Sequence, residues 1–192
     1  MNKDNIVGIV ILFIAVAVIA VWALVSSSSP KDIPEQQVNN EESVEFNGAL
    51  RLVSISSEYN AGDLIPVDLE LDSDSQSIVG ADLLIKYDPE LVGIADVDNI
   101  VEPESDFFVV YPADGQTKDG LIRFSLLTQK PQILSGKIAT VYFTAKKTGE
   151  VNLDLIFEKG KTNDSNIALS GKGIDILASV NNAIFKIVNS NQ

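Results

Sequence analysis

From about residue 48 onwards, apolar and polar side chains alternate along the chain with a period of two. In 64–72, four aliphatic residues occupy every second position, and the positions between them are mainly acidic; 151–158 repeats much of this pattern. A period of two sends successive side chains to opposite faces of a β-strand. The pattern predicts strands over 49–56, 64–72, 78–87, 92–97, 107–111, 121–128, 137–146, 151–158 and 182–188.

Turn-forming residues separate these runs, as at Asn60–Asp63 and at Asp88-Pro89. Asn, Asp, Gly and Pro favour turns because they accept positive φ, bond the local backbone through their side chains or fix φ. Many short strands without a long amphipathic helix are typical of two packed sheets. We therefore predict an all-β domain over 48–189, a jelly-roll β-sandwich of about nine strands, followed by a short tail at 190–192.

A different pattern precedes this domain. After a tail of five residues, 6–25 reads IVGIVILFIAVAVIAVWALV and has no charged side chain. Twenty helical residues span about 30 Å, which matches the hydrocarbon core of a bilayer. A secretory signal has a shorter apolar stretch, of about 7–15 residues. The run predicts one transmembrane helix in contact with the lipid bilayer, with a cleaved signal peptide as the alternative.

Residues 26–47 are rich in Ser, Pro, Asn and Glu, with little apolar surface, and we expect a flexible polar linker there. Lys3 and the amino terminus flank one end of the apolar run, and Lys31 lies beyond the other. This distribution of positive charges only slightly favours an amino terminus on the cytoplasmic side of the membrane. The β-rich, cysteine-free domain is of a kind displayed outside cells. We therefore predict a single-pass protein of the cell membrane with its C-terminal domain extracytoplasmic.

The composition of the chain excludes several classes of function. The chain has 14 basic and 27 acidic residues, a net charge of −13, which argues against nucleic-acid binding. It has no cysteine and no histidine, which excludes disulfides, thiolate or imidazole metal sites and His-dependent catalysis. The acidic runs at 72–76 and 96–99 lack the glycine and the glutamate of a calcium loop. We expect no metal, no cofactor and no catalytic residue, and a function that depends on binding.

Three stretches together resemble the cohesin domain of cellulosome scaffolds and related carbohydrate-binding modules. They are GADLLIKYDPEL at 80–91, GLIRFS at 120–125 and GKIATVYFTAK at 136–146. Their order and spacing agree with those of the cohesin domain over about 49–188. In the first stretch we expect the Tyr87 ring to point inward and the Asp88 side chain to accept a hydrogen bond in the turn that Pro89 begins.

The resemblance implies a non-catalytic jelly roll whose flat face captures a dockerin, a small calcium-loaded helical module of another protein. Asp82 matches an aspartate that helps cohesins bind the dockerin. Alternation sends Leu84 and Lys86 to the same face as Asp82, with Leu84 exposed, as we also expect for Ile156. If the strand order of the family holds, the partner-binding residues are Asp82, Leu84, Lys86, Arg123, Ser125, Asn152, Asp154 and Ile156. The alternative is that Asp82 is simply a solvent-exposed strand residue and binds no partner.

Direct binding of a polysaccharide is the second hypothesis, because related modules stack sugar rings on exposed aromatic side chains. The single Trp lies in the predicted membrane span, which leaves Tyr59 and Tyr111 as the candidate glycan-binding pair. One module on a membrane anchor also departs from cellulosome scaffolds, which carry several modules and a cellulose-binding domain.

Overall fold

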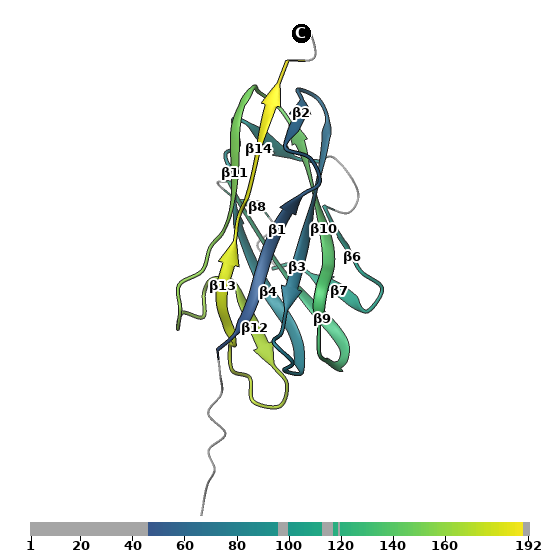
Figure 1. The fold of residues 1–192 in the computed structure, drawn as a ribbon, viewed down its shortest axis with the longest axis vertical. Coiled ribbons are helices and arrows are strands. Elements are labelled where there is room, and N and C mark those ends of the chain that lie inside the picture. The colour runs from purple at the N-terminus through teal and green to yellow at the C-terminus, as the bar shows by residue number, and fades with distance from the viewer. Residues whose placement is uncertain (1–45, 96–99, 113–116, 119, 190–192) are drawn as a thin grey trace, which may run out of the picture. The chain divides into compact units, whose positions relative to one another are not determined.

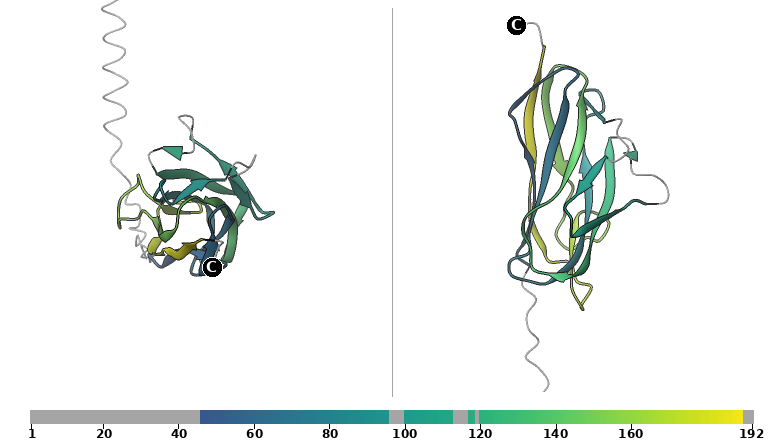
Figure 2. Two further views of the ribbon diagram at one scale, coloured as in Figure 1. Left: turned by 90° about the horizontal axis from the view of Figure 1, so that it is seen from above. Right: turned by 90° about the vertical axis from the view of Figure 1, so that its right-hand side faces the viewer.

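The computed structural model describes residues 46–95, 100–112, 117–118 and 120–189, which form a two-layer β-sandwich (Figure 1). These residues contain fourteen strands, six in one sheet and eight in the other. Seen end-on, the two sheets curl around a common core (Figure 2, left). The first strand begins and the last strand ends at opposite ends of the long axis (Figure 1).

The six-stranded first sheet has the order β13-β1-β3-β10-β5, and β6 pairs with another stretch of β10 than β5 does. β1 lies between two neighbours, antiparallel to β3 and parallel to β13. The strands of this sheet are β1 (Gly48–Ser54), β3 (Leu64–Asp72), β5 (Val92–Ile94), β6 (Val101–Pro103), β10 (Ser135–Ala145) and β13 (Leu177–Asn181).

The eight-stranded second sheet has the order β2-β14-β11-β4-β9-β7, with β12 on β4 and β8 on β9. All its pairs are antiparallel except β14 with β2. Its strands are β2 (Glu58–Asn60), β4 (Ile78–Lys86), β7 (Phe107–Val110), β8 (Thr117–Lys118), β9 (Leu121–Gln132), β11 (Gly149–Leu155), β12 (Asn166–Leu169) and β14 (Ala183–Val188).

The core consists of the alternate side chains that the two sheets turn toward each other. On β3 these are the four aliphatic residues of the predicted pattern, all with 0–1% of their surface exposed. Phe124, Phe143 and Phe185 are the largest fully buried side chains. The Tyr87 ring packs edge-on against Phe143, with ring centroids 5.8 Å apart, and Asp88 Oδ1 accepts the Glu90 N–H at 2.8 Å. Both expectations for this turn are confirmed.

Side-chain hydrogen bonds join the two sheets where the chain crosses between them. β13 and β14 are separated by Asn182, whose amide donates to Asp154 Oδ1 (2.8 Å) and whose Oδ1 accepts the Leu155 N–H (3.0 Å). Asp175 Oδ1 accepts both the Ile167 N–H of β12 and the Leu177 N–H of β13, each at 2.9 Å. These bonds hold strands of different sheets in a fixed relation.

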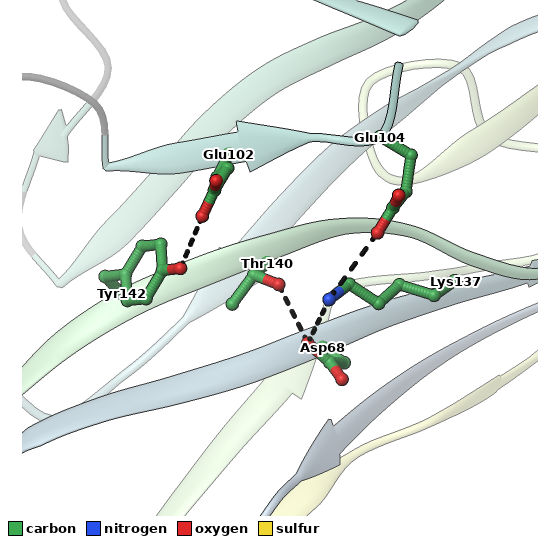
Figure 3. A network of polar contacts seen from close by, with 6 residues as sticks. All are labelled: Asp68, Glu102, Glu104, Lys137, Thr140 and Tyr142. Carbon is green, nitrogen blue, oxygen red and sulfur yellow. Dashed lines mark hydrogen bonds and ion pairs between the residues drawn. The ribbon is translucent and has the colours of Figure 1, made fainter. Parts of the chain in front are cut away.

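The outer face of the first sheet carries a network of paired charges (Figure 3). Lys137 Nζ lies 3.2 Å from Asp68 Oδ1 and 3.5 Å from Glu104 Oε1, and the Thr140 hydroxyl donates to Asp68 Oδ1 at 2.8 Å. The Tyr142 hydroxyl donates to Glu102 Oε2 at 2.5 Å, which raises the pKa of this phenol above its ordinary 10.0. The network fastens β6 and the residues after it to β10, and Lys137 offsets part of the negative charge of its three carboxylates.

The all-β sandwich is confirmed, but the expected number of about nine strands is too low for the described residues. The additional strands are β2, β6, β8, β12 and β13, each of five residues or fewer. Segments this short show hardly two periods of alternation, so the pattern cannot reveal them. The predicted final strand, 182–188, corresponds to β14, and β13 precedes it in the other sheet.

The described residues contain no helix long and apolar enough to cross a membrane. The predicted transmembrane helix at 6–25, the predicted linker up to residue 45 and the acidic run at 96–99 lie outside the described residues.

Candidate functional site

The outward side chains of β7, β9, β4 and β12 form one continuous face, here called the β4–β9 face. Cross-strand partners in a sheet point to the same side, so the register defines its rows. One row contains Phe108, Leu127, Gly80 and Ala168, and the next contains Val110, Ser125, Asp82 and Asn166. A third row pairs Arg123 with Leu84, and a fourth pairs Leu121 with Lys86, which has Asp154 of the neighbouring β11 on its other side.

Asp82 lies at the centre of this face with both carboxylate oxygens engaged. The Ser125 hydroxyl donates to Oδ1 in a short hydrogen bond, and the Asn166 amide donates to Oδ2 at 3.1 Å. The three side chains come from β9, β4 and β12 and hold one another in a single row. Asp82 is nevertheless exposed, so its remaining lone pairs face the solvent.

Apolar side chains flank this polar centre. Phe108 and Val110 on β7 are 45% and 43% exposed, and Leu127 lies beside Gly80 of β4. A Cβ atom on Gly80 would lie 2.4 Å from the Leu126 carbonyl oxygen and 2.9 Å from Leu127 Cδ2. Glycine at position 80 therefore permits the close approach of β9 to β4 and the packing of Leu127 against the backbone of β4.

The prediction that Leu84 is exposed is wrong: the residue is 8% exposed. The segment between β11 and β12 folds alongside it, because Ile156 N–H donates to Leu84 O (2.9 Å) and Leu84 N–H donates to Ser165 Oγ (3.0 Å). Ile156 itself is half-buried rather than exposed. Ser165 is fully buried and completes the edge of β4 between the end of β11 and the start of β12.

The same segment forms one wall of a groove of about 290 Å³ in the β4–β9 face. The floor consists of residues of β4 and β9, among them Leu84 and Arg123, and the opposite wall is the chain at the end of β7. The lining residues are Asp82, Leu83, Leu84, Val110, Tyr111, Pro112, Arg123, Phe124, Ser125, Thr162, Asn163 and Asp164. The groove lining thus combines apolar side chains with charged and hydroxyl-bearing ones, as protein-binding sites do.

The predicted partner-binding residues fall into two groups. Asp82, Leu84, Arg123 and Ser125 line the groove, whereas Lys86, Asn152 and Asp154 line a separate open cavity of about 430 Å³ near the turn at Asp88. Ile156 lines neither of them. Asn152 pairs with Ile184 of β14, away from β9. The groove therefore unites only part of the predicted set.

The two tyrosines of the glycan hypothesis lie at opposite edges of the second sheet. Tyr59 is on β2, where its hydroxyl accepts the Ser56 N–H at 3.1 Å and its ring packs edge-on against Phe185. Tyr111 follows β7 and is half-buried in the groove wall. Burial raises the pKa of its phenol above 10.0, and a hydrogen bond with the Val101 backbone offsets part of this rise. Nothing in this arrangement gives the two rings a shared platform.

The sequence predictions did not include several residues of the site: Phe108, Val110, Leu127, Thr162, Asn163, Asp164 and Asn166. Phe108, Val110 and Asn166 join the face through the pairing of β7 and β12 with β9 and β4. Leu127 is on β9 itself, and Thr162, Asn163 and Asp164 precede β12. Alternation in 107–111 places Phe108 and Val110 on one side of a strand and offers a signal for these two. Leu127 lies within the predicted strand 121–128, whereas Thr162, Asn163, Asp164 and Asn166 lie in short or irregular segments that show no periodic pattern.

Among the described residues, no group of three acidic side chains is placed to hold a metal ion. Arg123 and Lys86 make no ion pair within the described part of the chain, in contrast to Arg51, Lys137 and Lys161. The arrangement is thus a partly preorganised surface with two cations available to a partner.

Comparison with known proteins identifies the fold and the family. No curated protein matches the chain. Among solved structures, a cohesin module of a family 33 glycoside hydrolase from Clostridium perfringens is 16% identical, with a TM-score of 0.58, and covers 74% of this chain and 98% of its own. A non-cellulosomal cohesin from the archaeon Archaeoglobus fulgidus is 17% identical (TM-score 0.53; 74% and 94% covered).

A type I cohesin–dockerin complex from Clostridium thermocellum also matches, with 17% identity, a TM-score of 0.55, and 79% of this chain and 99% of that chain covered. At such identities the structures establish the shared fold alone. The family model for the cohesin domain, however, matches residues 50–174, which include most of both sheets and the whole β4–β9 face. The chain therefore belongs to the cohesin domain family.

Proposed function

We propose that this protein is a non-catalytic binding module that captures a dockerin-type protein partner on the β4–β9 face. The observation that carries the proposal is the row of Asp82, Ser125 and Asn166, an exposed and mutually bonded polar centre beside the exposed apolar side chains of β7. Interfaces combine apolar anchors with a few fixed polar groups, and side chains already held in place lose less entropy on binding. Family membership and the solved cohesin–dockerin complexes support the class of partner.

The test uses the full chain, purified in detergent, against a panel of calcium-loaded dockerin modules. At least one module should bind, and EDTA should abolish the binding because dockerins fold around calcium. Replacing Asp82 with alanine should weaken that binding about tenfold or more, the effect of removing an interface hot spot. The thermal midpoint should hardly change, because the freed Ser125 and Asn166 donors remain accessible to water.

Glu58→Ala is the matched control. It removes an exposed acidic side chain from β2, at the other edge of the same sheet, and should leave the affinity unchanged. Binding to immobilised polysaccharide without binding to any dockerin would contradict the proposal. So would equal affinities for the Asp82→Ala variant and the wild type.

We also propose that 6–25 anchors the protein in the cell membrane, with 26–47 as a spacer and the sandwich outside the cytoplasm. The uncharged run of twenty residues supports this, because its length matches a bilayer core. Protease added to intact cells should digest the sandwich, and the chain should stay in the membrane fraction after a high-salt wash. Recovery of a shortened chain in the medium would instead indicate a cleaved signal peptide.

A further inference from the structure

The groove contains one polar atom that the described part of the protein leaves without a partner. Asp164 is 9% exposed, and its Oδ2 accepts the Glu158 N–H in a short hydrogen bond that closes the base of the β11–β12 segment. Its Oδ1 is covered from solvent, yet no described group donates to it. Aspartate is rarely buried to this extent without pairing, because an unsatisfied buried acceptor is destabilising.

The surroundings of Asp164 indicate what the missing donor is. The charged residues that line the groove are Asp82, Asp164 and Arg123, so acidic side chains outnumber basic ones. Arg123 makes no ion pair within the described residues and is exposed, while both oxygens of Asp82 already accept hydrogen bonds. The chain as a whole has a net charge of −13, which favours the approach of a basic partner.

We propose that the groove receives a lysine or arginine side chain of the protein partner, which donates to Asp164 Oδ1. This inference rests on the proposed function, because it names the chemistry of the partner at the same face. Apolar lining residues such as Leu84 and Val110 offer contacts for the methylene stem of such a side chain while its charged end reaches the carboxylate. Thr162 and Asn163 precede Asp164 on the same wall and are exposed, so their side chains can give way without disturbing the core.

In this proposal Asp164 has opposite effects on the stability of the free protein and on the affinity for the partner. In the free protein its unpaired oxygen is a source of instability, and in the complex it becomes a charge-assisted hydrogen bond. Asp164→Asn keeps an oxygen for the Glu158 N–H and removes the buried charge. The variant should therefore unfold at the same temperature as the wild type or a higher one, yet bind the partner about tenfold or more weakly.

The first experiment needs no variant of the groove. A display library of a calcium-loaded dockerin module, with its exposed helical positions randomised among Lys, Arg, Glu, Leu and Ala, is selected on the full chain in detergent. Enrichment of Lys or Arg at one position supports the inference. Capture without any basic preference overturns it and leaves the proposed function intact, whereas capture of no module at all overturns the proposed function itself.

The second experiment measures the selected module against Asp164→Asn and a matched control, Glu158→Gln. The control removes the same charge from the same segment, but from a side chain that is 75% exposed and paired with Lys161. Loss of affinity in Asp164→Asn alone, with an unchanged or raised thermal midpoint, supports the inference. Unchanged affinity overturns it, and so does a loss of affinity that accompanies a lowered midpoint, because Asp164 would then only hold the segment in shape.

Discussion

Gly80→Ala should strongly destabilise the domain, by about 3 kcal/mol, the upper end of the usual effect of overpacking. The added Cβ would lie 2.4 Å from the Leu126 carbonyl oxygen, a backbone atom that can move only if β9 separates from β4. These two strands share eight register pairs and support the whole β4–β9 face. Urea unfolding of the variant and the wild type measures the difference directly.

Gly62→Ala is the appropriate control for Gly80→Ala. Gly62 has a φ of 95°, and nothing lies within 4 Å of where its Cβ would be, so this variant reports backbone strain without a steric clash. Its destabilisation should be about 1 kcal/mol, the order of the strain of a left-handed residue. An equal or smaller effect at Gly80 would show that β9 tolerates displacement and that the close approach of the strands is not required.

Asp175→Ala should also be strongly destabilising, because one carboxylate oxygen serves two strands of different sheets. Its Oδ1 accepts N–H groups from β12 and β13, and the substitution leaves both donors without an acceptor. Hydrogen bonds to charged groups contribute about 1.5–3 kcal/mol each, so we expect a loss of roughly 3 kcal/mol or more. The thermal or urea midpoint of the full chain measures this loss.

Asp175→Asn separates the hydrogen bonds from the charge. Asparagine retains one carbonyl oxygen in the same position, and one oxygen is all that the two donors use. The variant should therefore lose less than half of the stability lost in Asp175→Ala, because neutral acceptors bind more weakly. Equal losses in the two variants would indicate that the charge, rather than the bridge between the sheets, stabilises this joint.

The core could be predicted from sequence because its signal is local and repeated. The strand at 64–72 has the predicted bounds, since its alternation runs over nine residues with one buried face. The Tyr87 and Asp88 turn was also predictable, because Asp and Pro determine such turns through neighbouring atoms alone. Short strands such as β12 depend on partners that are distant in sequence, so they give no comparable signal.

The groove was only partly predictable for the same reason. Alternation correctly placed Asp82 and Lys86 on one exposed face, but it also placed Leu84 there, and Leu84 is buried. Its burial depends on Ser165, 81 residues later, whose hydroxyl accepts the Leu84 N–H. Asp164 likewise becomes notable only when its burial and its missing donor are known. Such properties arise from tertiary contacts and have no counterpart in a periodic pattern.

The position of β1 between two strands has a mechanical consequence. A pull on Gly48 along the long axis acts on the pairs that β1 makes with β13 over Gly48–Arg51 and with β3 over Ala49–Ser54. Bonds loaded in this way share the force and must fail together, whereas the bonds of a strand peeled sideways fail one after another. If residues before Gly48 are attached to a surface and a bound partner drags on the side of the sandwich, this strand resists the load where it enters the domain.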